Sequence, residues 1–300
     1  RLLYRTGIFA STRVGVPVIV VGNISTGGTG KTPGVIWLAQ CLLDHGFKPG
    51  IVSRGYGGSA RNPQRAAADG DARVVGDEAL LLARRAACPV WVARSRVAAA
   101  RGLLTAHPEC NVIISDDGLQ HYALQRDVEL VVIDGERGWG NGMLLPAGPL
   151  REPLRRLAKV DALVINGGAL FAPESLPPGV PAYDMRLSGA AFFDVHNPGR
   201  QVGPGHFTGQ TVHAVAAIGN PQRFFASLRD LGISFTAHAF PDHHAYMPAD
   251  CVFGANTAVI MTQKDAVKCE RLVGENWWAL RVDATIDPAL GELILHKIGK

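Results

Sequence analysis

A glycine-rich segment at residues 22–33 carries the residue types that bind phosphate. It contains Gly27, Gly28 and Gly30, and Lys31 and Thr32 follow Gly30 directly. Glycines let consecutive backbone N–H groups converge on a phosphate, a lysine reaches the β- and γ-phosphates of a nucleotide, and a threonine hydroxyl holds Mg²⁺. The usual G-x-x-x-x-G-K-[ST] pattern would begin at position 25, which is Ser25, so the segment is the Gly-Gly-x-Gly-Lys-Thr variant. The residues expected to bind the nucleotide are Ser25, Thr26, Gly27, Gly28, Thr29, Gly30, Lys31 and Thr32.

Two consecutive carboxylates, Asp116 and Asp117, follow an apolar segment at residues 112–115. Seen alone, such a pair is more often a turn with a helix cap than a metal site. Beside a phosphate loop, however, a carboxylate at the end of a neighbouring strand is typical of Mg²⁺ sites, because Mg²⁺ prefers oxygen ligands. The sequence therefore predicts a nucleotide and Mg²⁺, with Thr32, Asp116 and Asp117 as metal ligands.

A phosphoryl acceptor must be deprotonated or oriented by a carboxylate or a histidine. Asp77 follows Gly76 at the start of a helical segment, so it is either an ordinary helix N-cap or a general base at the site. His243 lies much later, in the polar sequence Asp242-His243-His244, which is typical of a surface loop. A catalytic role for this histidine requires two domains that close on each other.

Further motifs follow one another along the chain. They are Gly22-Asn23 with Gly27-Gly28-Thr29-Gly30-Lys31-Thr32-Pro33, Ser53-Arg54-Gly55-Tyr56-Gly57-Gly58, Gly76-Asp77-Glu78, Asp116-Asp117-Gly118-Leu119-Gln120-His121, Arg137-Gly138-Trp139-Gly140-Asn141-Gly142, Leu145-Pro146-Ala147-Gly148-Pro149-Leu150-Arg151-Glu152-Pro153, Gly219-Asn220-Pro221, Phe240-Pro241-Asp242-His243-His244 and Thr262-Gln263-Lys264-Asp265-Ala266-Val267-Lys268. In this combination and order, the chain resembles the tetraacyldisaccharide 4'-kinase family of lipid A biosynthesis. The resemblance runs from the first predicted strand almost to the C-terminus.

The resemblance implies transfer of the γ-phosphate of ATP to the 4'-hydroxyl of a tetraacylated glucosamine disaccharide 1-phosphate. It implies a peripheral enzyme at the cytoplasmic face of the bacterial inner membrane. It also implies two α/β/α domains joined by a β hairpin, with ATP between them. Family members dock on the membrane through an N-terminal amphipathic helix, and we expect nearly all of that helix to precede Arg1.

The resemblance also assigns roles to single residues. Asp77 matches the general base of the family, oriented by a histidine that we take to be His243 rather than His244. Gln263 stands where the family commonly has glutamate, so an ionic role at that position is in question. The other residues that match active-site positions of the family are Lys31, Glu78, Arg151 and Glu152.

A mostly parallel sheet is needed to bring these residues together. Continuous apolar and β-branched runs, typical of strands buried on both faces, recur with helical segments between them. The predicted strands span residues 16–21, 50–53, 90–93, 112–115, 129–134, 162–166, 212–218, 258–262 and 277–282. The predicted helices span residues 33–45, 77–87 and 288–298, with another that begins at Pro221 after its cap, Asn220.

The chain is long enough for two domains, since it has 300 residues and an average domain has roughly 150. We predict an α/β, P-loop NTPase-like sandwich with a mostly parallel sheet at residues 1–170. Residues 171–209 are predicted to be a linker with a β hairpin formed by residues 182–187 and 191–195. A smaller second α/β domain at residues 210–300 is predicted to close over the active site.

Composition excludes several classes of protein. The five cysteines are widely spaced and form no CxxC pair, which argues against a disulfide framework or a zinc site. No apolar run approaches the roughly 18 residues of a membrane span. The net charge is +4, and no run of adjacent Lys and Arg exceeds two, so we expect no nucleic-acid partner.

Arginine dominates the basic residues, with 23 Arg against 7 Lys, and arginine suits bidentate phosphate recognition. Arg54, Arg151 and Arg155 are candidates for contacts with the acceptor phosphate or lipid headgroups. They are equally well explained as surface residues whose stems cover apolar neighbours.

Two other functions are compatible with a phosphate loop. One is an ATPase or GTPase switch that positions or delivers a protein partner, and Thr262-Gln263-Lys264-Asp265 superficially fits a guanine-recognition element. That function leaves the second domain unexplained. The other is a nucleotide-binding structural module without turnover, which conflicts with the presence of Lys31, Asp77, Asp117 and His243.

Overall fold

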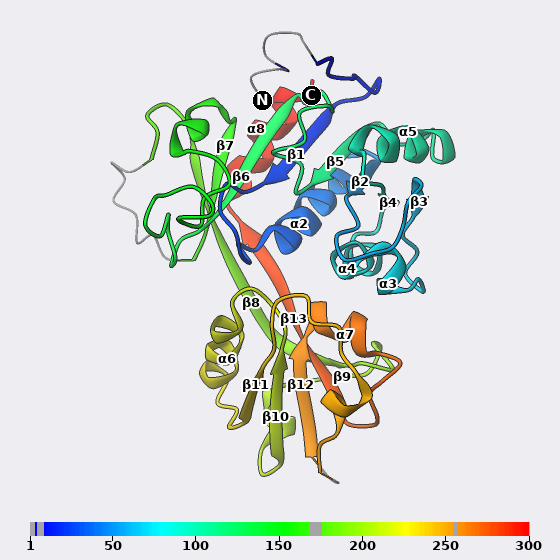
Figure 1. Ribbon diagram of the computed structural model, residues 1–300, viewed down its shortest axis with the longest axis vertical. Coiled ribbons are helices and arrows are strands. Elements are labelled where there is room, and N and C mark those ends of the chain that lie inside the picture. Colours follow the sequence, from blue (N-terminus) through cyan, green and yellow to red (C-terminus); the bar gives the residue numbers. More distant parts are fainter. Residues whose placement is uncertain (1–3, 5–8, 168–175, 255–256, 300) are drawn as a thin grey trace. The chain divides into compact units, whose positions relative to one another are not determined.

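The computed structural model describes residues 4, 9–167, 176–254 and 257–299, which form two compact units (Figure 1). Unit 1 comprises Arg1–Leu187 together with Ala284–Lys300, and unit 2 comprises Ser188–Asp283. The chain passes between the units within strands β8 (Ala182–Asp194) and β13 (Trp277–Ile286).

Unit 1 is built on a mostly parallel sheet. Along the chain its strands are β1 (Val18–Gly22), β2 (Pro49–Ser53), β3 (Gln64–Arg65), β4 (Val90–Val92), β5 (Val112–Asp116), β6 (Val128–Asp134), β7 (Ala162–Asn166) and the first part of β8. Their lateral order is β8-β7-β6-β1-β5-β2-β4-β3, and only the short β3 pairs antiparallel, with β4. Strand β1 therefore lies between β5 and β6, so the loop that follows β1 has the ends of two other strands beside it.

Helices cover both faces of this sheet. They are α2 (Lys31–Asp44), α3 (Ala72–Val75), α4 (Asp77–Arg85), α5 (Arg96–Ala106) and α8 (Pro288–Lys297), with a 3₁₀ helix, η1 (Leu154–Lys159). Val18 and Val20 of β1 are buried in one cluster with Leu103 of α5. On the opposite face, Val21 lies with Leu38 of α2 and Leu290 of α8. Burial on both faces explains the uninterrupted apolar runs of the strands.

Unit 2 has a smaller parallel sheet with the order β11-β10-β12-β13. Its own strands are β9 (Gln201–Val202), β10 (Thr211–Ala216), β11 (Thr236–Ala239) and β12 (Thr257–Thr262). Its helices are α6 (Pro221–Asp230) and α7 (Gln263–Cys269), with two 3₁₀ helices, η3 (Pro204–Phe207) and η4 (Pro248–Cys251). One apolar cluster joins Phe225 of α6 to Trp278, and a second joins Cys269 of α7 to Met261, so both faces of this sheet are also covered.

The predicted strands and helices are confirmed, with ends that differ slightly and with β13 continuing beyond its predicted end to Ile286. The cap of α6 is also confirmed, since the Asn220 side chain accepts a hydrogen bond from the backbone N–H of Arg223 and Pro221 is the first helical residue. The class predicted for the fold, a mostly parallel α/β structure, is the one observed.

The predicted hairpin at residues 182–187 and 191–195 is wrong. These residues form the single strand β8, whose short antiparallel partner is β9. Gly189 lies between the two predicted strands, within β8. A β-carbon built at Gly189 would overlap the carbonyl oxygen of Arg281 in β13, so the strand needs glycine for close backbone approach.

The predicted domains, 1–170, 171–209 and 210–300, remain a prediction, and the boundary near residue 170 lies outside the described residues. The compact units divide the chain differently. Helix α8 belongs to unit 1 together with α2. The two helices pack closely, since a β-carbon built on Gly291 of α8 would lie 3.0 Å from the sulfur of Cys41 in α2.

Candidate active site

The phosphate loop connects β1 to α2 in the predicted way. Helix α2 begins at Lys31, its N-cap residue Gly30 has φ 91°, and no side chain caps its first turn. Gly27 also has positive φ, at 98°. An uncapped helix N-terminus leaves backbone N–H groups and the positive end of the helix dipole for an anion. The local backbone is therefore that of a phosphate site.

Neighbouring segments hold this loop in place. The Asn166 side chain, at the end of β7, donates a hydrogen bond to the carbonyl oxygen of Thr29 at 3.0 Å. The backbone N–H of Thr26 donates to the carbonyl of Pro149 at 2.8 Å, and the backbone N–H of Arg151 donates to the carbonyl of Ile24 at 2.6 Å. The connection between β6 and β7 thus pairs directly with the phosphate loop.

Asp116 lies at the end of β5, where it is 2% exposed. Its Oδ2 accepts a hydrogen bond from the Ser53 hydroxyl at 3.2 Å, and its backbone carbonyl accepts one from Arg96 at 2.9 Å. Burial, together with the nearby carboxylates of Glu78 and Asp117, raises the pKa of Asp116 to about 7 against the opposing effect of nearby cations. This carboxyl therefore lies among negative charges that a cation would relieve.

Asp117 is surrounded by cations instead. Arg151 Nη1 lies 3.0 Å from its Oδ1, and Lys31 Nζ lies 3.8 Å from the same oxygen. Burial alone would raise the pKa of Asp117, but Lys31 and Arg151 outweigh burial and lower it. Its backbone has φ 45°, a left-handed conformation that aspartate tolerates better than most residues.

Asp77 is the first residue of α4, and the cap position belongs to Gly76, which has φ 88°. The Asp77 side chain accepts a hydrogen bond from the N–H of the next residue, Glu78, at 2.8 Å. With 6% exposure it is largely buried. The ordinary N-cap interpretation of Asp77 is therefore not the one observed, while its catalytic role stays a prediction.

His243 and His244 lie in unit 2 and have different surroundings. The Nε2 of His244 lies 2.9 Å from an Asp250 carboxylate oxygen, and its ring stacks on Phe240 at 4.7 Å. His243 adopts φ 59°, and its Nε2 lies 3.4 Å from Lys264 Nζ. His244 is thus held by contacts within unit 2, and the choice of His243 rather than His244 stays a prediction.

Glu152 belongs to an extended network of unit 1. Its carboxylate accepts hydrogen bonds from Gln120 at 2.9 Å and from the Tyr122 hydroxyl at 2.8 Å. Arg151, its neighbour, contacts the Gln120 amide oxygen at 3.3 Å. The predicted residue Glu152 therefore fixes the segment that presents Arg151.

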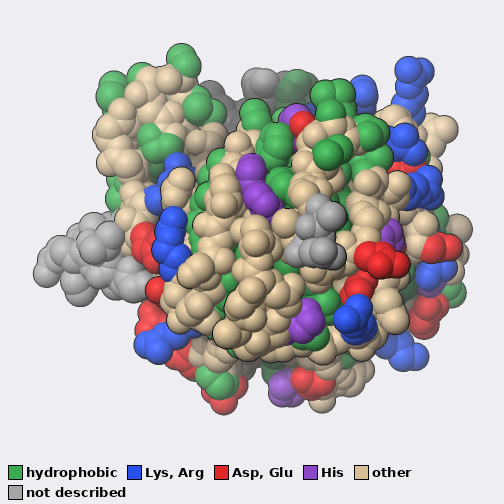
Figure 2. Space-filling model, turned by 90° about the horizontal axis from the view of Figure 1, so that it is seen from below, with side chains coloured by type: hydrophobic (Ala, Val, Ile, Leu, Met, Phe, Trp, Pro, Cys, Tyr) green, Lys and Arg blue, Asp and Glu red, His purple; other side chains and the backbone are tan. Residues whose placement is uncertain are grey.

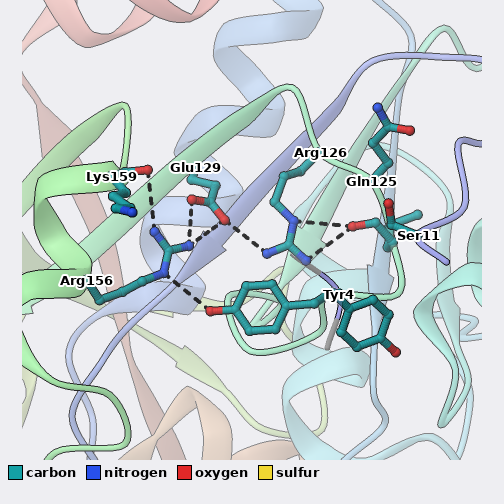
Figure 3. A pocket seen from close by; sticks show the side chains of 9 residues that line it. Tyr4, Ser11, Gln125, Arg126, Glu129, Arg156 and Lys159 are labelled. Atoms are coloured by element: carbon teal, nitrogen blue, oxygen red, sulfur yellow. Dashed lines mark hydrogen bonds and ion pairs between the residues drawn. The ribbon is translucent and has the colours of Figure 1, made fainter. Parts of the chain in front are cut away.

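The network continues into a pocket of about 270 Å³ beside the amino ends of β1 and β6 (Figure 3). There Glu129 binds Arg156 at 2.6 Å and Arg126 at 3.0 Å. Figure 3 shows both guanidinium groups pointing at the Glu129 carboxylate. The phosphate loop follows the carboxyl end of β1, so this pocket is not the nucleotide site.

Three residues of the site escaped the sequence argument. Ser53, Arg96 and Asn166 all lie at or just after the carboxyl ends of strands β2, β4 and β7. The backbone N–H of Arg96 donates to Nε2 of His121 at 3.1 Å, and its guanidinium holds the carbonyls of Asp116 and Asp117. The sequence feature that could have identified these three residues is a polar side chain at or just after the end of a predicted parallel strand.

The guanine-recognition interpretation of residues 262–265 does not fit the structure. Asp265 is fully buried, and its Oδ2 accepts hydrogen bonds from the Thr262 hydroxyl at 2.7 Å and from the backbone N–H of Ala217 at 3.1 Å. Its other oxygen pairs with Lys268 at 2.8 Å. This carboxylate stabilises the start of α7.

The chain is similar to known proteins over nearly its whole length. A family model described as tetraacyldisaccharide-1-P 4'-kinase matches residues 1–299. The chain belongs to this family. It is 53% identical over 298 residues to a tetraacyldisaccharide 4'-kinase of Methylobacillus flagellatus, covering 99% of this chain and 87% of the relative. It is 50% identical over 298 residues to that of an Azoarcus species, covering 99% and 86%.

A solved structure extends the comparison. The crystal structure of LpxK from Aquifex aeolicus in complex with ATP matches with a TM-score of 0.81 and 29% identity, covering 99% of this chain and 93% of that one. As a member of the tetraacyldisaccharide-1-P 4'-kinase family, the chain is an ATP-dependent phosphotransferase. The alternative of a switch that positions a protein partner is not favoured.

The lowered pKa of His121 predicts that stability depends on pH. Burial and the charge of Arg96 lower the pKa of His121 from 6.5 to about 4. Between these values the unfolded chain binds the proton more strongly, so this histidine contributes stability above pH 6.5 that is lost as pH falls toward 4. We expect His121→Gln, which keeps an acceptor but does not titrate, to lose less melting temperature between pH 7.5 and pH 5 than the parent. The exposed His296→Gln is the control, and equal losses in parent and His121→Gln would contradict the prediction.

Proposed function

We propose that the chain transfers the γ-phosphate of ATP to the 4'-hydroxyl of a tetraacylated glucosamine disaccharide 1-phosphate at the cytoplasmic face of the bacterial inner membrane. The observation that carries the proposal is the phosphate loop with Lys31 and Arg151 converging on Asp117. Membership of the tetraacyldisaccharide-1-P 4'-kinase family supports the acceptor.

Mg²⁺ is part of the proposal. Among the described residues, no group of three or more His, Cys, Asp or Glu side chains is suited to a metal ion. A phosphoryl-transfer site needs fewer protein ligands, because nucleotide phosphates and water complete the coordination. The raised pKa of Asp116, caused by burial and two nearby carboxylates, fits a cation at this place. Thr32, Asp116 and Asp117 would hold the ion, which when bound neutralises charge on the β- and γ-phosphates.

Other residues of the chain are proposed to bind the phosphates, to position the carboxylates and to accept the hydroxyl proton. Lys31 and the N–H groups at the start of α2 bind the phosphates, while Arg96 fixes the backbone that carries Asp116 and Asp117. Asp77 is proposed to accept the proton of the 4'-hydroxyl. His243 is proposed to act with Asp77 during turnover, as the family resemblance implies.

An apolar tip, Met143–Leu145, supports a lipid acceptor. Its three side chains are 52%, 46% and 54% exposed. They are held outward by local hydrogen bonds, including those from Leu145 N–H to the Leu150 carbonyl at 2.8 Å and from Leu150 N–H to the Met143 carbonyl at 3.0 Å. We propose that this tip contacts acyl chains of the membrane that holds the acceptor.

No helix of the described residues is long and apolar enough to cross a bilayer. On the one face that Figure 2 displays, acidic and basic side chains are intermixed, with apolar side chains between them. That face therefore has no single sign of charge to select a partner.

The phosphate loop is tested by Lys31→Ala. We expect the rate of lipid phosphorylation to fall at least about 10²-fold, because a fixed cation at the β/γ bridge stabilises charge that develops in the transition state. Labelled ATP and the disaccharide lipid provide the assay, with Lys48→Ala, an exposed lysine, as control. Normal turnover by a folded Lys31→Ala enzyme would remove the loop from the mechanism.

The roles of Asp77 and His243 are tested by a double-mutant cycle. We expect each alanine variant to lower kcat about 10²- to 10⁴-fold with little change in ATP affinity. Because residues that act as one unit are not additive, the double variant should be scarcely slower than Asp77→Ala. His296→Ala, on the exposed side of α8, is the control. Losses that multiply in the double variant would refute the joint role.

The apolar tip is tested with acceptor presented in phospholipid vesicles. We expect Leu144→Ser with Leu145→Ser to raise the KM for the lipid roughly tenfold, corresponding to about 1.5 kcal/mol of lost apolar burial, without changing the KM for ATP. Val252→Ser, at a 78% exposed apolar position of unit 2, is the matched control. An unchanged lipid KM in the tip variant, or an equal rise in the control, would contradict the proposal.

A further inference from the structure

Arg137 occupies a distinctive place beside the phosphate loop. Because β1 lies between β5 and β6, the loop has Asp116 and Asp117 on one side and the end of β6 on the other. The chain that leaves β6 at Asp134 reaches Arg137 three residues later. The metal-side carboxylates and Arg137 therefore approach the loop from opposite neighbouring strands.

The backbone at Arg137 is fixed by Asp134. Asp134 is 3% exposed, and its Oδ1 accepts hydrogen bonds from the backbone N–H of Glu136 at 3.1 Å and of Arg137 at 3.2 Å. The backbone N–H of Gly138 donates to the Asp134 carbonyl at 3.0 Å. A turn held by a buried carboxylate defines where the Arg137 side chain begins.

The guanidinium of Arg137 lies directly against Gly27 of the phosphate loop. A β-carbon built on Gly27 would overlap Nη1 of Arg137 and come within 3.3 Å of its Cζ. Gly27 has φ 98°, so glycine both permits the turn and leaves the space that the guanidinium occupies. Because Gly27 has no side chain, the Arg137 guanidinium lies directly against the backbone of the phosphate loop.

The charge of Arg137 also differs from that of the other cations here. Lys31 and Arg151 both have Asp117 as an ionic partner. In the part of the chain that the structure describes, the Arg137 guanidinium has no hydrogen bond and no ion pair. An unneutralised guanidinium beside backbone N–H groups is suited to a phosphate oxygen.

We infer that Arg137 contacts the γ-phosphate and acts as an internal arginine finger, an inference that rests on the proposed function. In the reaction the acceptor oxygen forms a bond to the γ-phosphorus as the bond from that phosphorus to the β–γ bridging oxygen breaks. The hydroxyl proton passes to Asp77, and ADP leaves with the bonding electron pair. Arg137 keeps its protons and stabilises negative charge on the γ-phosphoryl oxygens.

The inference is tested with Arg137→Ala, Arg137→Lys and the control Arg101→Ala, which changes an exposed arginine of α5. We expect Arg137→Ala to lower kcat about 10²- to 10³-fold with less than a threefold change in the KM for ATP. Arg137→Lys should recover only part of the rate, because an ammonium cannot form the bidentate contact. Arg101→Ala should match the parent.

A binding measurement supplies a readout apart from turnover. With Mg²⁺ present, ADP with aluminium fluoride mimics the transferring phosphoryl group, and we expect Arg137→Ala to lose affinity for this mimic while it binds ADP alone like the parent. A kcat within threefold of the parent, an effect confined to the KM for ATP, or an equal loss of affinity for ADP alone would overturn the inference. A parent enzyme that fails to phosphorylate the lipid would instead refute the proposed function, and unchanged melting temperatures exclude misfolding.

Discussion

The N-terminus of α2 has no side-chain cap, and the rest of the site is arranged around this constraint. Unpaired N–H groups at a helix start are costly unless an anion or water satisfies them. Here the loop before the helix turns through Gly27 and Gly30 at positive φ, which aims its backbone at one point. Asn166 and the segment around Pro149 then hold the loop through its outward-facing groups. These supports all belong to unit 1.

Electrostatic balance explains why buried carboxylates are tolerated beside the loop. Asp116 has its pKa raised by burial and by Glu78, whereas that of Asp117 is lowered by Lys31 and Arg151. Two adjacent carboxylates therefore differ in character because of their neighbours. Arg96, itself buried, donates to the backbone carbonyls of both and so stabilises their positions without neutralising either side chain directly. A buried carboxyl with a raised pKa and an ion-paired carboxylate with a lowered pKa thus follow each other in the sequence.

Much of this arrangement could be predicted from sequence, and the failures have physical causes. Apolar runs located the strands because both faces of the sheet are buried, and glycine spacing located the phosphate loop. Ser53, Arg96 and Asn166 could not be assigned because their importance depends on which strands are neighbours, and sequence order does not give lateral order. The hairpin at residues 182–187 and 191–195 was predicted wrongly because the glycine between its two strands, Gly189, serves close backbone approach, and such a glycine looks the same in sequence as one required for a bend. Sequence order also could not show that α8 belongs to unit 1, because that depends on contacts between residues far apart in the chain.

The connection between β6 and β7 combines requirements that usually belong to separate loops. Its first turn is fixed by the buried Asp134, its residues Pro149 and Leu150 pair with the phosphate loop, and the apolar tip is exposed between these two points. A loop tethered at both ends in this way loses little conformational entropy when its side chains bind a ligand. Arg137 near one tether and Arg151 at the other therefore carry their charges to the phosphate loop from a single segment. The segment that exposes the apolar tip is thus the same one that places Arg137 and Arg151 beside the phosphate loop within unit 1.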